Sequence, residues 1–240
     1  MPPVSWHHKR MAAFDVESTG VDPETDRIVT STISVVGGDA PADTVSWLAD
    51  PGVEIPAGAT NVHGITTEQA RSEGRPAAEV VDEITAKLAE QSRAGVPIVA
   101  FNARYDLTML DREARRHGLE PLLERVGGAD ALLVVDPLII DKQLDRYRKG
   151  KRTLTAVCAQ YGVPLEDAHA ADADAIAAAR VAWKLAQTFP ELDGIELGEL
   201  HRQQTSWAAE QAASLQEYFN SQGKNEHVEQ AWPVVPLPAA

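Results

Sequence analysis

The sequence predicts an α/β fold in which a mixed, five-stranded sheet is flanked by helices, with a helical extension at the C-terminus. Three strand-like stretches joined by turns occupy the first 50 residues. Short apolar runs then alternate with helical patterns up to about residue 190. Consecutive strands followed by alternating strands and helices are typical of a sheet that combines antiparallel and parallel strands. The 240 residues, of which 44% are hydrophobic, are enough to build one core of good size.

The N-terminal third supplies three of the five predicted strands. Residues 10–18 form an apolar run that ends at Gly20, where a turn is expected. Residues 28–36 (IVTSTISVV) are rich in β-branched side chains, which favour strands, and residues 43–48 form the third candidate. The stretch over 51–66 contains repeated Gly and Pro, and it predicts turns.

Strands and helices alternate from there to residue 188. The first helix covers 76–93, because apolar residues recur there at helical spacing after a Pro at the start. The remaining predicted elements are, in order, a strand over 97–101, a helix with Asn102 as N-cap that ends at Gly118, a strand over 131–135, a helix after Asp136-Pro137, a helix from Thr153 to Gly162, and a helix over 171–188.

The last 50 residues differ from the rest, so we expect one domain over 1–190 and an extension over 191–240. Residues 196–220 form a long helical pattern with one apolar stripe, and the segment AWPVVPLPAA after it is expected to be extended. The stripe packs either on its own domain or on a partner protein. Its members are Leu197, Leu200, Trp207, Ala208, Leu215, Tyr218 and Phe219.

The sequence also predicts a cytoplasmic location. No run of 18 apolar residues predicts a membrane-spanning helix, and the N-terminus has no apolar stretch of the secretory type. The single cysteine, Cys158, cannot form an internal disulfide and lies in an apolar helical segment. We interpret it as a small buried hydrophobic residue.

Four acidic residues and one histidine form the most informative pattern. Asp15 and Glu17 stand two apart at the end of a predicted strand, so their side chains point to the same face. Asp106 is one turn inside a helix that follows a buried strand, and Asp174 begins another helix five residues after His169. Strand ends and helix starts converge at one rim of a sheet. Four carboxylates gathered there repel one another unless cations occupy the site.

These residues lie in segments that resemble the three motifs of the DEDDh, or DnaQ-like, 3′–5′ exonuclease family. The resemblance covers residues 10–188 and places Asp174, rather than the nearby Asp172, at the family spacing. The third motif has a histidine where other branches have tyrosine, which indicates the His-type branch. The three segments are FDVEST (14–19), N-x-x-x-D (Asn102–Asp106) and H-x-A-x-x-D (His169–Asp174). Separately, NVHGIT (61–66) is similar to a histidine-glycine-isoleucine turn that is common in the family.

The resemblance implies a ribonuclease-H-like fold and a two-metal hydrolysis that releases nucleoside 5′-monophosphates. Asp15, Glu17, Asp106 and Asp174 would hold two Mg²⁺ or Mn²⁺ ions about 3.5–4 Å apart, with Asp15 as the bridging ligand. All-oxygen ligands suit these cations, and the chain has no Cys/His cluster of the kind that binds structural zinc. His169 would take the proton from the attacking water near neutral pH.

Five residues are expected to border the terminal nucleotide rather than to bind metal. They are Phe14, Ser18 and Thr19 beside the first motif, His63 as a wall of the site, and Asn102, which is first of all an N-cap.

The expected substrate is the 3′ end of single-stranded DNA, for proofreading or repair. The net charge of −14 is unusual for a protein that coats duplex DNA, but an enzyme that handles only the last few nucleotides needs few phosphate contacts. Residues 146–152 (RYRKGKR) hold five basic residues in seven. They form either a solvated loop or a phosphate-contacting one.

Two other functions stay open. An exoribonuclease of the oligoribonuclease or tRNA-trimming type would share the fold and the metal chemistry, because discrimination depends on contacts at the 2′ position. A non-cleaving adaptor for nucleic acid or a polymerase is the third hypothesis. The enzyme is expected either to stand alone, or to act as a subunit like the epsilon subunit of DNA polymerase III, or to form a homodimer, with residues 196–220 as the contact surface.

Overall fold

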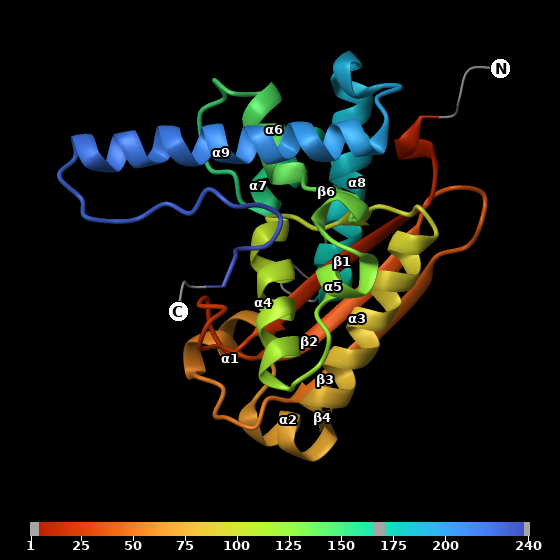
Figure 1. Cartoon of the computed structure of the whole chain (residues 1–240), viewed down its shortest axis with the longest axis vertical. Coiled ribbons are helices and arrows are strands. Elements are labelled where there is room, and N and C mark those ends of the chain that lie inside the picture. Colours follow the sequence, from red (N-terminus) through yellow and green to blue (C-terminus); the bar gives the residue numbers. More distant parts are fainter. Residues whose placement is uncertain (1–4, 166–170, 238–240) are drawn as a thin grey trace.

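The computed structural model describes residues 5–165 and 171–237 and shows a twisted sheet with helices on both faces (Figure 1). The sheet has six strands in the order β4-β3-β2-β1-β5-β6. The strands are β1 (Met11–Ser18), β2 (Ile28–Val36), β3 (Asp43–Asp50), β4 (Arg75–Pro76), β5 (Ile98–Val99) and β6 (Val134–Val135).

The sheet is mixed, as predicted. Strand β1 pairs antiparallel with β2, which in turn pairs antiparallel with β3. On its other side β1 pairs parallel with β5, and β5 pairs parallel with β6. The difference from the five predicted strands is β4, two residues that pair parallel with the end of β3. A two-residue strand has too little alternation to be recognised from sequence.

The helices that were predicted are present, with boundaries shifted by a few residues. The turn-rich stretch 51–66 was wrong in part, because it contains α1, a seven-residue helix between Pro56 and the left-handed Gly64. Pro and Gly at its two ends also signal turns, which hid the short helix. The α-helices are α1 (Ala57–His63), α2 (Thr67–Glu73), α3 (Ala77–Arg93), α4 (Ala103–Arg116), α5 (Leu122–Val126), α6 (Pro137–Leu144), α7 (Leu154–Tyr161), α8 (Ala171–Thr188) and α9 (Leu197–Ser221).

The two faces of β1 belong to two separate apolar cores. Ala12, Phe14 and Val16 pack with side chains of α3 and α4 on one face. Met11 and Ala13 pack with side chains of α8 on the other. The strict alternation follows from the period of 2 in a strand. It also determines that Asp15, like Ala13, faces α8.

The cysteine prediction is confirmed. Cys158 on α7 is a free thiol buried in the same core as α8. Burial raises its pKa to about 11. The side chain of His7 is also buried, with Nδ1 bonded to Ser5 Oγ at 2.9 Å.

Helix α9 covers the open edge of the sheet at β6. Val134 N donates to His201 Nδ1 at 3.2 Å, and Asp136 N donates to Gln204 Oε1 at 2.6 Å. Gln204 Nε2 in turn donates to Val134 O at 2.9 Å. Side chains of a helix thus replace the hydrogen bonds that a further strand would make. The first half of α9 therefore packs on its own domain.

The segment after α9 turns back over the start of α4, as Figure 1 shows. Arg104 Nη1 donates to Glu229 O at 2.8 Å, and Val235 N donates to Thr108 Oγ1 at 3.0 Å. Buried Arg112 donates to the carbonyls of Val235 and Pro236, each at 3.0 Å. The C-terminal segment is thus attached along the helix that carries Asp106. In the parts of the chain described here, no helix is both long and apolar enough to cross a membrane.

Replacing Gln204 with leucine should destabilise the protein by about 2–4 kcal/mol, because buried Asp136 N and Val134 O would both lose their partner. Urea unfolding measures this change. The control is Gln203→Leu, whose side chain bonds only Glu199 and should cost less than about 0.5 kcal/mol. Equal stabilities of the two variants would contradict the role of Gln204 at the sheet edge.

Candidate active site

Two of the predicted acidic residues stand side by side on β1. Asp15 and Glu17 lie opposite Thr32 and Thr30 of β2, and both face the side of the sheet that α8 covers. A register shift follows immediately between Glu17 and Ser18. The end of β1 therefore presents two carboxylates on one face, as the spacing of the first motif predicts.

Asp106 reaches β1 from the neighbouring helix. It occupies the first turn of α4, which begins where β5 ends. Its Oδ1 accepts a hydrogen bond from Val16 N at 3.1 Å, between the two acidic residues of β1. Because β5 runs parallel to β1, the start of α4 and the end of β1 lie at the same rim of the sheet.

Asp174 approaches from the opposite face. It lies in the first turn of α8, which packs against both β1 and β2. Its charge raises the pKa of both Asp15 and Glu17. The exposed Asp172 stands two residues earlier and lines a cavity together with Glu17, so the choice of Asp174 over Asp172 stays a prediction from the sequence spacing.

The four carboxylates form one electrostatic group. Burial raises the pKa of Asp15 well above its ordinary value, and the charges of Asp106, Glu17 and Asp174 raise it further. Burial and Asp174 together raise the pKa of Glu17 to about 7. The pKa of Asp106 is also raised, mainly by burial, although the bond from Val16 N opposes the shift. Nearby cations would reverse each of these shifts.

The donor chemistry of this group fits hard divalent cations, because every member is a carboxylate. Across residues 5–165 and 171–237, however, no three His, Cys, Asp or Glu side chains are arranged so that they could hold one metal ion together. Asp106 turns one oxygen to Val16 N instead. The ligand roles of Asp15, Glu17, Asp106 and Asp174 therefore stay predictions, as does the role of His169, which lies outside the described residues.

A cavity of about 380 Å³ opens beside Glu17. His63, the last residue of α1, lines it, and His63 Nδ1 accepts from Ile65 N at 3.2 Å. Burial lowers the pKa of His63, which favours the neutral imidazole. The position of His63 suits a wall of the site. Hydroxyls of Thr30, Thr32 and Ser46 also line this cavity.

The residues predicted to border the nucleotide beside the first motif point inward. Ser18 Oγ donates to Gly20 O at 2.6 Å, and Thr19 Oγ1 donates to Asp26 Oδ1 at 2.9 Å. The Phe14 side chain is fully buried in the core beneath α3 and α4, so it faces the core rather than the cavity beside Glu17. Backbone atoms of Ser18 and Thr19 are what remains for contact with a nucleotide.

The helix-capping prediction for Asn102 was wrong in its mechanism. Asn102 precedes α4 in the left-handed conformation, with φ of 69°, and its side chain makes no capping bond. Asp136 accepts from Asn102 N at 3.0 Å and from Ala103 N at 2.9 Å instead. Sequence analysis missed this role, although Asp136 before Pro137 signalled the start of a helix.

Tyr105, beside Asp106, is a second residue that sequence analysis did not single out. Its hydroxyl donates to Gly20 O at 2.6 Å and lies 2.5 Å from Ser18 Oγ. Helix α4 is thereby connected to the turn that follows Glu17. A tyrosine has no signal in the sequence that distinguishes this contact from ordinary packing.

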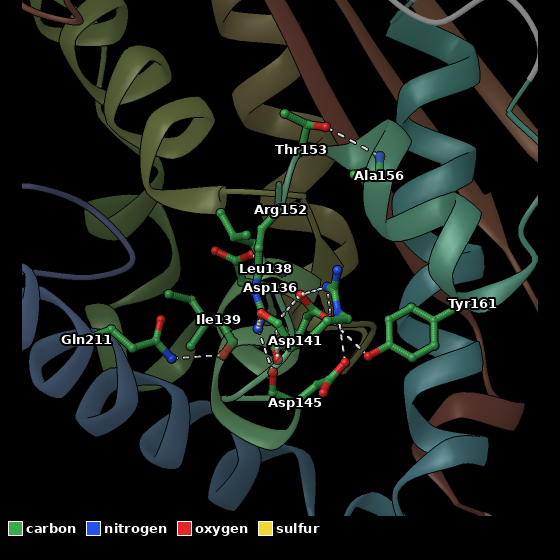
Figure 2. Close-up of polar contacts among 11 residues, drawn as sticks. Asp136, Leu138, Ile139, Asp141, Asp145, Arg152, Thr153, Ala156, Tyr161 and Gln211 are labelled. Atoms are coloured by element: carbon green, nitrogen blue, oxygen red, sulfur yellow. Dashed lines mark hydrogen bonds and ion pairs between the residues drawn. The ribbon is translucent and has the colours of Figure 1, made fainter. Parts of the chain in front are cut away.

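The basic segment 146–152 separates into two sets of side chains. Arg148 and Arg152 both donate to the carboxylate of buried Asp141, which also accepts from Tyr161 at 2.8 Å (Figure 2). These two arginines neutralise a carboxylate of α6 and join the loop to that helix. Tyr161 connects α7 to the same carboxylate. Arg146, Lys149 and Lys151 are exposed. Only part of the segment is therefore available for phosphate contacts.

In the absence of divalent cations, the free energy of unfolding of Glu17→Gln should increase relative to that of the unchanged protein as the pH rises. The pKa of Glu17 is about 7 instead of 4.5, so the folded protein holds this proton more tightly than the unfolded chain. The stabilisation of the folded state that results from this proton is present below pH 4.5 and is lost as the pH rises through about 7. Glutamine stays neutral throughout.

Urea unfolding in EDTA at about pH 5 and about pH 8 tests this expectation. Glu90→Gln, on the exposed side of α3, is the control. If the free energies of unfolding of Glu17→Gln and the unchanged protein differ by the same amount at both pH values, the pKa of Glu17 is not raised by folding.

The chain was compared with known proteins. The family model described as "Exonuclease" matches residues 12–182. Similar curated proteins are the PolC-type DNA polymerase III of Listeria innocua, 28% identical over 184 residues, and that of Lacticaseibacillus paracasei, 27% identical over 182 residues. Each alignment covers 76% of this chain and 12% of the relative, so the chain spans a small part of these polymerases.

Solved structures of Exonuclease I share the fold. The Escherichia coli enzyme in complex with a dT13 oligonucleotide has a TM-score of 0.63 and 19% identity, covering 77% of this chain and 42% of that chain. The enzyme from Methylocaldum szegediense has a TM-score of 0.62 and 20% identity, covering 76% and 41%. The ribonuclease-H-like sheet is thus confirmed. Since the family model spans all three motifs, the chain belongs to the DnaQ-like 3′–5′ exonuclease family.

Proposed function

We propose that this protein removes nucleotides one at a time from the 3′ end of single-stranded DNA by metal-dependent hydrolysis and releases nucleoside 5′-monophosphates. The observation that supports this most directly is the gathering of Asp15, Glu17, Asp106 and Asp174 at one rim of the sheet, where the pKa values of the first three are raised. A protein has little reason to bury like charges together unless they serve a cationic ligand.

Asp15, Glu17, Asp106 and Asp174 are the proposed ligands of two Mg²⁺ or Mn²⁺ ions. When bound, such ions stabilise the departing 3′ oxygen and make a bound water more acidic. Asp15 would hold the ions together with the other three carboxylates, all of which raise its pKa. Asp106 keeps one oxygen on Val16 N and offers the other.

His169 is the proposed general base. It precedes Asp174 by five residues in the sequence, which is the spacing of the third motif. A neutral imidazole with an ordinary pKa of ~6.5 accepts a proton from water near neutral pH. The backbone at Ser18 and Thr19 and the ring of His63 are proposed to hold the terminal nucleotide.

The relatives favour DNA as the substrate. The polymerases that the chain matches are DNA polymerases, and one similar Exonuclease I structure contains a dT13 oligonucleotide. One observation supports RNA as the second candidate, namely that three residues with hydroxyl groups, Thr30, Thr32 and Ser46, line the cavity beside Glu17. Hydroxyls can exchange hydrogen bonds with a 2′-OH, which DNA lacks.

A role beside a polymerase is a narrower proposal that rests on the PolC-type relatives alone. The contact surface predicted over 196–220 is smaller than expected, because Leu200, Gln204 and Ala208 of α9 are buried within this chain. The expected homodimer through this helix stays a prediction for the same surface.

A time course on 5′-labelled single-stranded DNA and on its RNA counterpart tests the function. We expect a ladder that shortens one nucleotide at a time from the 3′ end with Mg²⁺ or Mn²⁺ and stops with EDTA. The faster substrate decides between DNA and RNA. Oligomers that stay intact with both metals would refute hydrolysis and favour the adaptor hypothesis.

His169→Ala should lower turnover by at least about 100-fold, because the attacking water would lose its proton acceptor. Binding of Mn²⁺ and of oligonucleotide should persist. The control, His227→Ala, removes an exposed histidine of the C-terminal segment and should leave turnover unchanged. Turnover of His169→Ala close to that of the unchanged protein would exclude His169 as the base.

Asp15→Ala should lose Mn²⁺ binding together with activity, because its carboxylate lies among the other three. Isothermal titration calorimetry with Mn²⁺ measures this directly. If the variant bound Mn²⁺ as tightly as the unchanged protein, Asp15 would not be a ligand.

A further inference from the structure

A groove runs between α6 and the second half of α9. Two adjoining cavities, of about 100 and 390 Å³, form it, and both are lined by Lys142, Gln211 and Leu215. Gln211 of α9 bridges the groove floor by donating to Ile139 O of α6 at 3.0 Å (Figure 2). The proposed chemistry at the acidic group does not use this groove.

One wall of the groove is basic. Lys142 on α6 and Arg146 just after it line the larger cavity, and both are exposed. In the described parts of the chain, no carboxylate is in ion-pair distance of either residue, whereas Arg148 and Arg152 are paired with Asp141. Two basic side chains without an ion-pair partner among the described residues, in a chain of net charge −14, are suited to an anionic ligand.

The facing wall is apolar and aromatic. Leu215 and Tyr218 of α9 line the larger cavity, and they remain 43% and 57% exposed. These two residues belong to the apolar stripe of the helix, but they have no core to pack on, unlike Leu200 and Ala208. Proteins bind single-stranded nucleic acid with cations along one side of a groove and exposed aromatic rings along the other. The cations contact the phosphates, and the rings stack on the bases.

The inner end of the groove lies at the start of α4, the helix that carries Asp106. Asn102, Arg104 and Asp136 line the smaller cavity. Asp106 lies four residues after Asn102 on α4, which is about one helical turn, or ~6 Å. The charge of Asp136 also raises the pKa of Asp106, as expected for neighbouring groups. A strand whose 3′ end lies at the acidic group can therefore continue into the groove.

We propose that this groove binds the single-stranded DNA on the 5′ side of the bond that is cleaved. Lys142, Arg146 and Arg104 contact its phosphates, and Tyr218 stacks on a base. The inference rests on the proposed exonuclease function and extends it, because it assigns substrate contacts to α6 and α9, away from the acidic group.

The test compares two substrates. An oligothymidylate of about 12 nucleotides is long enough to occupy the groove, whereas thymidine 5′-(4-nitrophenyl) phosphate is too short to extend from the active site into it. The double variant Lys142→Ala/Arg146→Ala and the single variant Tyr218→Ala should each raise the KM for the oligonucleotide at least about fivefold. Their kcat/KM for the nitrophenyl ester should stay unchanged.

Three further variants sharpen the test. Tyr218→Phe keeps the ring and should behave like the unchanged protein. Glu210→Gln removes an acidic residue from the groove and should lower the KM for the oligonucleotide, a gain that misfolding cannot imitate. Lys9→Ala removes one positive charge near the other end of β1 and should have no effect.

The salt dependence of binding gives a further measurement. Loss of two phosphate contacts should make the slope of log binding constant against log salt concentration less steep by about 1.4.

Fluorescence anisotropy of a labelled oligothymidylate in EDTA separates the two proposals, because it needs no cleavage. Suppose that both substrates are cleaved and that the Lys142→Ala/Arg146→Ala and Tyr218→Ala variants bind the oligonucleotide as tightly as the unchanged protein. This outcome would refute the proposed binding groove and leave the exonuclease function standing. If the unchanged protein cleaves neither substrate but these variants bind the oligonucleotide more weakly than it does, the groove would be supported and the exonuclease function refuted.

Discussion

The buried carboxylate of Asp136 accepts hydrogen bonds from the backbone amides of Asn102, Ala103 and Leu138, which belong to the starts of two different helices. Its own amide donates to Gln204 of α9, and Trp232 of the C-terminal segment approaches the same carboxylate at 3.4 Å. One residue just after β6 thus joins α4, α6 and the C-terminal segment through its side chain, and α9 through its backbone amide. Burial raises its pKa, while the amide bonds counteract that shift, as a helix N-terminus does for an anion.

The position of the candidate site depends on this junction. Asp106 stands one turn into α4, so any movement of the helix start would move its carboxylate away from Val16 N. Asn102 adopts a left-handed conformation, with φ of 69°, where α4 begins, which costs on the order of 1 kcal/mol and must be supported by the bonds around it. Tyr105, through Gly20, and the C-terminal segment, through Arg112, hold the same helix from two further sides. The extension after residue 190 is in this sense part of the support of the site.

The distribution of charge explains how an acidic chain could handle a nucleic acid. Most basic side chains described here are used internally: Arg148 and Arg152 on Asp141, and Arg112 on Asp111 and Glu24. What remains near the site is a short basic wall at Lys142 and Arg146. A few phosphate contacts give weak, salt-sensitive binding, which suits an enzyme that shortens one strand from its end and releases it. The acidic group itself requires cations before a phosphate can approach.

The sequence by itself determined the order of the main elements, the mixed sheet and the family, because hydrophobic periodicity and the motif spacings are local properties of the chain. It also placed Asp15 and Glu17 on one face, since that follows from the period of a strand. Only the tertiary structure decided which side chain caps α4, which arginines of 146–152 are structural, and that Phe14 faces the core. It also divided the apolar stripe of α9 into a half that covers β6 and a half that lines a groove. These outcomes depend on partners such as Asp136, Asp141 and Gln204, which lie far away in sequence and carry no local signal of what they will meet.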